Sequence, residues 1–213
     1  RVVPHYRAFL KRFPTGRSLA SAPLADVLKA WQGLGYNRRA KMLHEAAKKV
    51  VQTHGSRIPR DLPSLESLPG IGPYTARAIA AFAYDEDTVF IETNLRTAVI
   101  HHFYPGQEKV ADAELLDVLA KALPKGRSRE WYAALMDYGA YLKRSGIRVN
   151  HRSATYAKQK AFKGSDREAR GAILRALVAG PHSPAKLHGL LGTGRREQMK
   201  RALATLVRDG MLR

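Results

Sequence analysis

The stretch Leu68–Tyr84, LPGIGPYTARAIAAFAY, decides the fold because it joins two helical segments through a turn that contains two glycines. Gly70 and Gly72 allow the backbone to turn sharply and to approach another surface closely. Pro73 stands where a new helix begins, a position that proline favours. The preceding residues predict a short helix that is capped by Ser64 and ends at Leu68. The sequence therefore predicts a helical hairpin.

The start of the second hairpin helix is suited to an anion. N–H groups near Gly70, Gly72 and Thr75 would face the same point as the positive end of the helix dipole. Such a helix start binds phosphate whatever the base sequence of a nucleic acid. The alternative is that the turn is only a linker between two helices, which would account for one glycine but less well for two.

The overall charge favours the phosphate interpretation. The chain has 213 residues, of which 45% are hydrophobic, with a formal net charge of +19 and a pI of about 10.5. This excess indicates a polyanionic partner, most simply nucleic acid, since solubility alone needs only a few net charges. A basic ribosomal-type protein and a membrane-surface protein are the alternatives.

Outward from the hairpin, the hydrophobic pattern is helical. Apolar residues recur at helical spacing in the segments 2–13, 23–35, 37–55, 113–124 and 128–144. In the third of these segments one face carries Ala40, Leu43, Ala47 and Val50. The residues TVFIE at 88–92 are the one strand candidate. We therefore predict an all-α fold for about the first 145 residues.

The C-terminal part has a different composition. Residues 141–163 contain several basic residues and no acidic one, which predicts a connector that is solvated or bound to a partner. Three short helices are expected after it. Ser165 and Glu168 have capping-box spacing, and Ser183 precedes Pro184 as a second cap. The predicted segments are a main domain at 1–145, a basic connector at 146–164 and a helix-turn-helix-like domain at 165–213.

The three C-terminal helices predict a helix-turn-helix whose second and third helices face DNA, with the wing of a winged helix expected beyond Arg213. A small helical cap with a solvated basic face is the alternative.

The composition excludes several kinds of site. The chain has no cysteine, so it has no disulfide, thiolate metal site or cysteine-ligated iron–sulfur cluster. No apolar run is long enough for a membrane span, and no signal peptide is visible. The chain begins at Arg1, so we expect a natural N-terminus upstream. The absence of cysteine leads us to expect a protein of the cytoplasm or nucleoid. Metal-ligand spacing is lacking at the histidines, which argues against zinc: His101, His102, His151, His182 and His188.

Several segments together resemble the helix-hairpin-helix DNA glycosylase superfamily, which includes endonuclease III and the MutY type of adenine glycosylase. The hairpin is followed by FIETNLRTAVI at 90–100, where the family has a catalytic Asp before a TN or GN pair. Segment 13–50 is similar to the MutY branch, and MDYGAYL at 136–142 to the helix that leads into the iron–sulfur loop. The resemblance covers residues 2–142 and implies a two-lobed helical fold.

The resemblance places Glu92 where the family has its catalytic Asp. The extra methylene of Glu moves the carboxylate by about 1.5 Å, which can cost about 100-fold in rate unless the backbone compensates. Glu92 is therefore an adapted catalyst, an impaired one or a surface acid. Asn94 is predicted to cap the following helix. A second catalytic Glu of the adenine glycosylases would precede Arg1.

Tyr74 stands where strand-cutting members of the family use a lysine amine to form a Schiff base. A phenol cannot do this, so the resemblance implies a monofunctional enzyme without lyase activity. Tyr36 and Asn37, together with Tyr74, are candidates for the base pocket or the lesion strand. The branch usually has an aromatic residue at Asn37, which argues against adenine opposite 8-oxoguanine as the substrate.

The remaining site predictions concern binding. Hairpins of this superfamily often hold a monovalent cation through backbone carbonyls, here those of Glu66, Leu68 and Ile71. No other cofactor is expected. Arg96 is either a phosphate contact or solvated. The candidate DNA contacts are Gly70, Ile71, Gly72, Tyr74, Thr75, Arg96, Arg195 and Arg196.

The predicted function is base excision from duplex DNA by a monomer. A damaged or mismatched base leaves the stack, and its N-glycosidic bond is hydrolysed to an abasic site. The alternatives are a mismatch thymine or uracil glycosylase on the same scaffold and a catalytically inactive protein that binds DNA lesions or structures.

Overall fold

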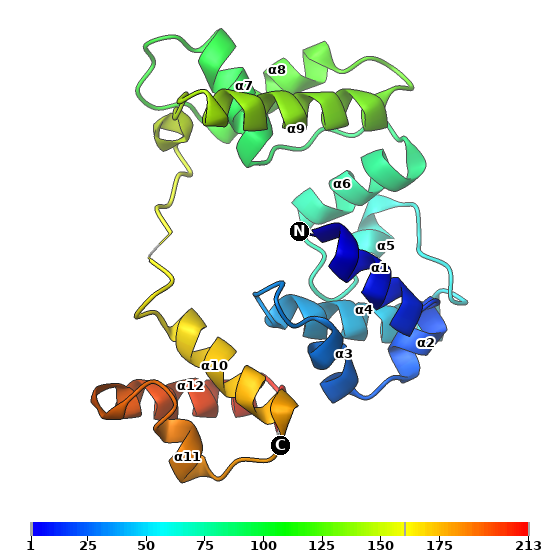
Figure 1. Ribbon diagram of the computed structural model, residues 1–213. Helices are drawn as coiled ribbons and strands as arrows, with labels where there is room; N and C mark the ends of the chain where they lie inside the picture. Colours follow the sequence, from blue (N-terminus) through cyan, green and yellow to red (C-terminus); the bar gives the residue numbers. More distant parts are fainter. Residues whose placement is uncertain (1, 160, 213) are drawn as a thin grey trace. The chain divides into compact units, whose positions relative to one another are not determined.

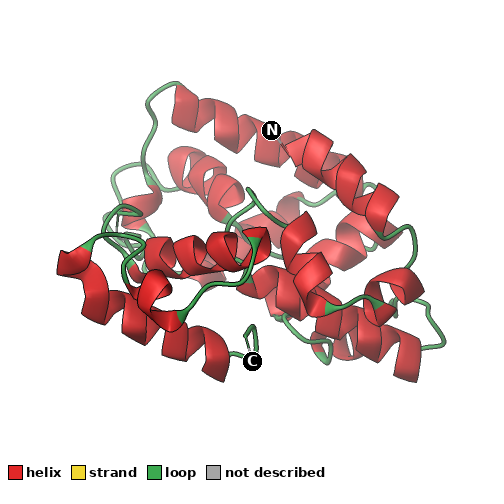
Figure 2. Ribbon diagram, turned by 60° about the horizontal axis from the view of Figure 1, so that its bottom comes forward, coloured by secondary structure: helices red, strands yellow, loops and turns green. Residues whose placement is uncertain are grey.

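The computed structural model describes residues 2–159 and 161–212, and the elements within these ranges are helices joined by loops and turns (Figure 1; Figure 2). This confirms the predicted all-α class. The expected strand at 88–92 is wrong, because these residues are extended without a neighbouring strand to complete a ladder. The described residues contain one isolated bridge, between Val110 and Ser153.

The chain divides into two compact units, which are described separately. The first unit comprises residues 1–58, 68–70 and 159–213, and the second comprises 59–67 and 71–158. This division follows packing and does not coincide with the predicted segments, whose boundaries stay predictions. No helix in the described ranges is long and apolar enough to cross a membrane.

The first unit contains seven α-helices and one 3-10 turn among its described residues. Its core joins Val27 and Leu28 from the N-terminal part with Ile173 and Leu206 from the C-terminal part. Its elements are α1 (Val2–Arg12), α2 (Gly16–Ser21), α3 (Leu24–Ala30), α4 (Arg38–Thr53), α10 (Asp166–Ala179), α11 (Pro184–His188), η2 (Thr193–Arg195) and α12 (Arg196–Arg208).

Three of the four residues predicted for the buried face of α4 are buried, and Ala46 is buried in addition. Ala40, Ala47 and Val50 are buried as expected, whereas Leu43 is 40% exposed and His44 is buried in its place. His44 lies four residues after Ala40 and three before Ala47, so it shares their helical face. Burial lowers the pKa of His44 because the charged imidazolium loses its hydration.

Helices α10 and α11 begin at the predicted caps. Ser165 Oγ accepts from the N–H of Glu168, and Ser183 Oγ accepts from the N–H of Lys186. The Glu168 carboxylate closes back onto the N–H of Gly164. α10 and α11 both pack on α12 (Figure 1). A DNA-facing helix-turn-helix with a wing stays a prediction.

The second unit carries both helices of the hairpin and Glu92. Its elements are α5 (Leu62–Glu66), α6 (Pro73–Tyr84), α7 (Thr93–Phe103), α8 (Asp112–Ala122), α9 (Ser128–Arg144) and η1 (Asn150–Arg152). α7 packs on both α8 and α9, and the three lie together in Figure 1. Among the buried residues of this unit, one group lies around Ile100 and Leu115 and another around Phe90 and Tyr132.

A glycine sets the distance between α7 and α9. Gly139 is buried in α9, and a Cβ added there would lie 2.1 Å from the carbonyl oxygen of Asn94. Real Cβ atoms do not approach so closely, so only glycine fits at this crossing. The first turn of α7 is therefore pressed against the backbone of α9.

Candidate active site and DNA-binding hairpin

The hairpin forms as predicted, with a different cap on its first helix. Asp61 is the N-cap of α5, and its Oδ1 accepts from the N–H of Ser64 at 2.9 Å. The prediction that Ser64 is the cap is wrong, because Asp61 closes the helix start three residues earlier. The guanidinium of Arg77 then joins the two arms: its Nη1 lies 3.1 Å from both Glu66 Oε1 and the Pro73 carbonyl.

The two hairpin glycines have different roles. Gly70 has φ of +78°, and a Cβ added there would lie 2.6 Å from the Cβ of Met42. Gly72 has φ of −96°, and nothing lies within 4 Å of an added Cβ. Gly70 is therefore required by the fold, whereas Gly72 leaves open space at the start of α6. No side chain caps α6 at Gly72.

Glu92 is the N-cap of α7 and closes the helix with its own carboxylate. Its Oε1 accepts from the N–H of Asn94 at 2.5 Å and of Leu95 at 2.8 Å. The prediction that Asn94 is the cap is wrong, since Asn94 lies inside the first turn and its Oδ1 is buried without a hydrogen-bond partner. Glu92 is partly exposed, and its Oε2 lies outside both cap bonds.

An aromatic series connects the hairpin to the segment that carries Glu92. The ring of Tyr74 meets the ring of Phe90 edge-on at 5.7 Å between centroids, and Phe90 stacks on Tyr132 at 4.1 Å. Tyr132 is fully buried, and its hydroxyl donates to the Thr88 carbonyl at 2.9 Å. Burial raises the pKa of this hydroxyl. Tyr74 of the hairpin therefore contacts Phe90 directly, and Phe90 precedes Glu92 by two residues in the sequence.

Arg96 lies on α7 and is engaged within the second unit. Its Nη2 pairs with Asp112 Oδ2 at 2.8 Å, and its side chain is 19% exposed. This ion pair connects α7 to the start of α8. A phosphate contact by Arg96 stays a prediction.

Tyr36 is held from the C-terminal side of the chain, a contact that the sequence pattern did not reveal. Its hydroxyl accepts from Gln159 Nε2 at 2.5 Å and from Arg167 Nη1 at 3.1 Å. These hydrogen bonds, that from Gln159 first, lower the pKa of Tyr36. The residue has φ of +48° and is 55% exposed. Asn37 follows at the N-cap of α4 without a side-chain cap bond.

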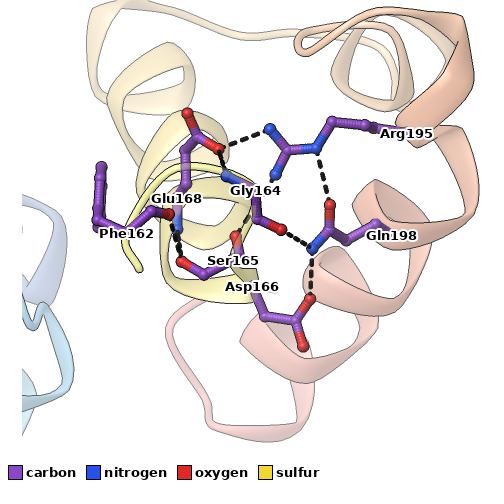
Figure 3. Close-up of polar contacts among 7 residues, drawn as sticks. All are labelled: Phe162, Gly164, Ser165, Asp166, Glu168, Arg195 and Gln198. Atoms are coloured by element: carbon purple, nitrogen blue, oxygen red, sulfur yellow. Dashed lines mark hydrogen bonds and ion pairs between the residues drawn. The ribbon is translucent and has the colours of Figure 1, made fainter. Parts of the chain in front are cut away.

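Arg195 is engaged in a network that fixes the start of α10 (Figure 3). Its Nη1 contacts Glu168 Oε2 at 2.6 Å, and its Nε donates to Gln198 Oε1 at 2.8 Å. Gln198 in turn donates to the Gly164 carbonyl and to Asp166. Arg195 thus has a structural contact in this unit, while Arg196 beside it is exposed. DNA contacts by these two arginines stay predictions.

The comparison with protein families decides the relationship. Residues 1–162 match the sequence model of HhH-GPD superfamily base excision DNA repair proteins. The chain belongs to this superfamily. The predicted membership in the helix-hairpin-helix glycosylases is thereby confirmed, and the α5–α6 hairpin and Glu92 lie inside the matched region of this HhH-GPD chain.

Curated relatives extend the similarity to the C-terminal helices. The chain is 37% identical to an adenine DNA glycosylase of Mycolicibacterium smegmatis and 34% identical to one of Mycobacterium tuberculosis. Each alignment covers all of this chain, and 78% and 76% of the respective relatives. These relatives confirm the MutY-type branch and a DNA N-glycosylase of base excision repair.

Solved structures support the fold. A thermostable thymine-DNA glycosylase matches with a TM-score of 0.56 and 25% identity, covering 64% of each chain. A non-covalent endonuclease III–DNA complex matches with a TM-score of 0.55 and 18% identity, covering 65% of this chain and 64% of that one. The HhH-GPD chain thus spans just under two thirds of both structures.

The residues present do not fit an iron–sulfur cluster. Such clusters are held by cysteine thiolates, and the sequence has none. The described residues also contain no group of three His, Asp or Glu side chains that could hold a metal ion. The monovalent cation at the backbone of Glu66, Leu68 and Ile71 stays a prediction.

Proposed function

We propose that this glycosylase removes adenine from mispaired duplex DNA and leaves an abasic site without cutting the strand. The observation that carries the proposal is Glu92 at the start of α7, with Oε1 bonded to the helix and Oε2 outside both bonds. The adenine DNA glycosylases that align along the whole chain support adenine as the base.

Glu92 would act on the sugar after the base has left the stack. Cleavage of the N-glycosidic bond builds positive charge on the deoxyribose, which a fixed carboxylate stabilises. The free Oε2 would orient or deprotonate the attacking water. The folded-back side chain takes up the length of the extra methylene, which supports the adapted catalyst among the three interpretations of Glu92.

Tyr74 supports the monofunctional character of the proposed reaction. A strand-cutting enzyme needs an amine to form a Schiff base with the sugar, and this position carries a phenol whose ring packs on Phe90. The proposed enzyme works as a monomer on chromosomal DNA. It needs no iron–sulfur cluster, and a monovalent cation at the hairpin carbonyls is its one proposed ion.

The proposed DNA contacts begin at the hairpin. Gly72 leaves open space at an uncapped helix start, where the N–H groups of the first turn would meet a phosphate. Ile71, Tyr74 and Thr75 flank this point, and Arg96, Arg195 and Arg196 are proposed as further phosphate contacts. Tyr36 and Asn37 are proposed to face the lesion strand.

A mismatch thymine or uracil glycosylase is the second candidate. Asn37 favours it, because the adenine-specific branch usually has an aromatic residue there, and the solved thymine-DNA glycosylase is similar in fold. The two candidates share Glu92 and Tyr74 and differ in the base that they accept.

A panel of duplexes tests these candidates. The full-length protein is incubated with adenine opposite 8-oxoguanine or guanine, and with thymine or uracil opposite guanine, before alkali breaks the abasic sites. We expect alkali-dependent cleavage of the adenine duplexes, and cleavage of the thymine or uracil duplexes alone would favour the second candidate. Strand cutting without alkali would contradict the monofunctional assignment.

The substitution Glu92→Gln tests the catalyst. We expect the rate to fall by about 10²- to 10⁴-fold while DNA binding is retained, because the amide keeps the size of the side chain and loses its charge. Glu108→Gln is the matched control, since Glu108 is exposed in a loop of the same unit. If wild type and Glu92→Gln bind alike and neither forms abasic sites, the protein is a lesion-binding module.

A further inference from the structure

The segment Asn150–Thr155, here called the polar clamp, is tied to three parts of the second unit. The sequence predicted it as part of a solvated or partner-bound connector, and the structure corrects this for these residues. Asn150 reaches the start of α7, Arg152 reaches the loop after α7, and Thr155 reaches the start of α8. The family resemblance places the iron–sulfur loop in this part of the chain.

Asn150 joins the clamp to the first turn of α7. Its Nδ2 donates to the Thr93 carbonyl at 3.2 Å, and its Oδ1 accepts from Thr97 Oγ1 at 3.1 Å. Thr97 is fully buried, and its hydroxyl also lies 2.9 Å from the Thr93 carbonyl. The amide of Asn150 thus uses both its donor and its acceptor on the turn that follows Glu92.

The backbone of the clamp pairs with the loop before α8. The N–H of Val110 donates to the Arg152 carbonyl, and the N–H of Ala154 donates to the Val110 carbonyl, both at 2.8 Å. The guanidinium of Arg152 donates to the carbonyls of Gln107 and Tyr104. Val110 is fully buried, so its two backbone bonds to the clamp are shielded from water.

Asp112 completes the clamp at the start of α8. Its carboxylate accepts from Thr155 Oγ1 at 3.1 and 3.2 Å and pairs with Arg96 of α7 at 2.8 Å. Ser153, which is 5% exposed, lies 3.5 Å from the same carboxylate. One aspartate therefore joins α7, α8 and the clamp.

We propose that Asn150 is a positioning residue for Glu92 and that the polar clamp holds the start of α7. The inference rests on the proposed function for its effect on rate. A misplacement of about 1 Å at a reacting group can cost about 100-fold. Asn150 acts through Thr93 and Thr97, and the Glu92 carboxylate is fixed to the same turn.

The first experiment separates positioning from DNA binding. In Asn150→Ala we expect the single-turnover rate constant for base release to fall by about 10- to 100-fold, while the Kd for the duplex changes less than about threefold. Arg148→Ala is the control, because Arg148 is exposed just before the clamp and carries a charge that Asn150 lacks. A weaker Kd with an unchanged rate constant in Asn150→Ala would overturn the proposal.

A second pair of variants uses a residue that DNA cannot reach. Thr97→Val removes the hydroxyl at nearly constant volume, and Thr97→Ser keeps it. Thr97 is fully buried, so neither variant changes a DNA contact. We expect the rate of base release to fall in Thr97→Val, which loses the bond to Asn150, and to stay near the wild-type rate in Thr97→Ser. Equal rates in the two variants would contradict a role of the hydroxyl bond to Asn150.

Hydrogen exchange tests the clamp without any activity. The N–H groups of Asn94 and Leu95 donate to Glu92, and we expect them to exchange at least about tenfold faster in Asn150→Ala, with no change in α6. Unchanged protection would overturn the clamp even in an active enzyme. If the wild-type protein is inactive on all duplexes, the proposed function is wrong, but the hydrogen-exchange measurement still tests the clamp.

Discussion

In helices α6 and α7, the N–H groups of the first turn have no hydrogen-bond acceptor within their own helix. At α7 the Glu92 carboxylate takes two of these donors, and Gly139 and Asn150 fix the turn from outside. At α6 the N-cap is Gly72, without a side-chain cap and with open space around it. We propose that the closed start holds a group for chemistry and that the open start leaves donors for a ligand. The two starts therefore predict opposite responses to substitution.

The largest effect is expected at the closed start. Gly139→Ala would place a methyl group 2.1 Å from the Asn94 carbonyl oxygen, so α7 and α9 must separate. We expect a loss of about 3 kcal/mol in unfolding free energy, at the upper end for overpacking, measured by urea denaturation. Base release should also slow, because the turn that carries Glu92 moves.

A second glycine in a helix provides the control for this change. Gly171 lies inside α10, where an added Cβ would meet only Arg175 Nη1 at 3.6 Å. Gly171→Ala should raise stability by up to about 1 kcal/mol. A similar effect of the two alanines would refute the close crossing of α7 and α9.

The next effect concerns the length of the Glu92 side chain, the proposed catalyst. Glu92→Asp keeps an acid at an N-cap position that favours Asp, so the melting temperature should stay close to wild type. The carboxylate moves by about 1.5 Å, and we expect base release to slow by about 100-fold in single-turnover assays. A faster Asp variant would show that Glu92 is an impaired catalyst.

Local features of the fold could be predicted from the sequence. Glycine, proline and helical periodicity predicted the hairpin, because such local preferences act within a few residues. The spacing also predicted the caps at Ser165 and Ser183. The family resemblance supplied Glu92, which composition alone would have left as a surface acid.

Contacts between distant residues could not be predicted in this way. Two caps were assigned to Ser64 and Asn94 because those residue types favour caps, whereas Asp61 and Glu92 hold the positions. The bond from Arg167 to Tyr36 spans more than a hundred residues. A single sequence carries no signal for such pairs, since each partner is also an ordinary surface residue.

The open start should respond in binding more than in stability. Gly70→Ala meets Met42 and needs a left-handed backbone, so we expect about 1–3 kcal/mol of destabilisation. Gly72→Ala has neither problem and should leave the melting temperature unchanged while weakening binding to all duplexes several-fold. Binding would be measured by fluorescence anisotropy on damaged and undamaged DNA.

The pattern across DNA sequences decides the role of Gly72. A phosphate contact carries no base information, so the loss in Gly72→Ala should be equal on every duplex. A loss of affinity confined to one lesion would place Gly72 in the base pocket, and the start of α6 would then not be a phosphate site that contrasts with the start of α7.

The smallest effect is expected near the start of α9, where the Asp87 carboxylate binds Gly126 before the helix and the side chain of Ser128 in its first turn. Asp87 accepts from Ser128 Oγ at 2.8 Å and from the N–H of Gly126 at 3.0 Å. These hydrogen bonds, that from Ser128 first, lower the pKa of Asp87 below its ordinary value of 3.8. The folded state therefore favours the ionised form, whose stabilising effect is complete above about pH 4 and is lost as the pH falls through the lowered pKa.

Asp87→Asn should therefore reduce stability most at neutral pH, with the difference from wild type narrowing below about pH 4. Urea midpoints between pH 2.5 and 7 measure this difference. Asp137→Asn is the control, since Asp137 is exposed on the same helix. A pH-independent difference for Asp87→Asn would mean that the carboxylate charge does not hold the start of α9. Because α9 carries Gly139, a loosened α9 start should also slow base release slightly, whereas binding at the open start of α6 should not change.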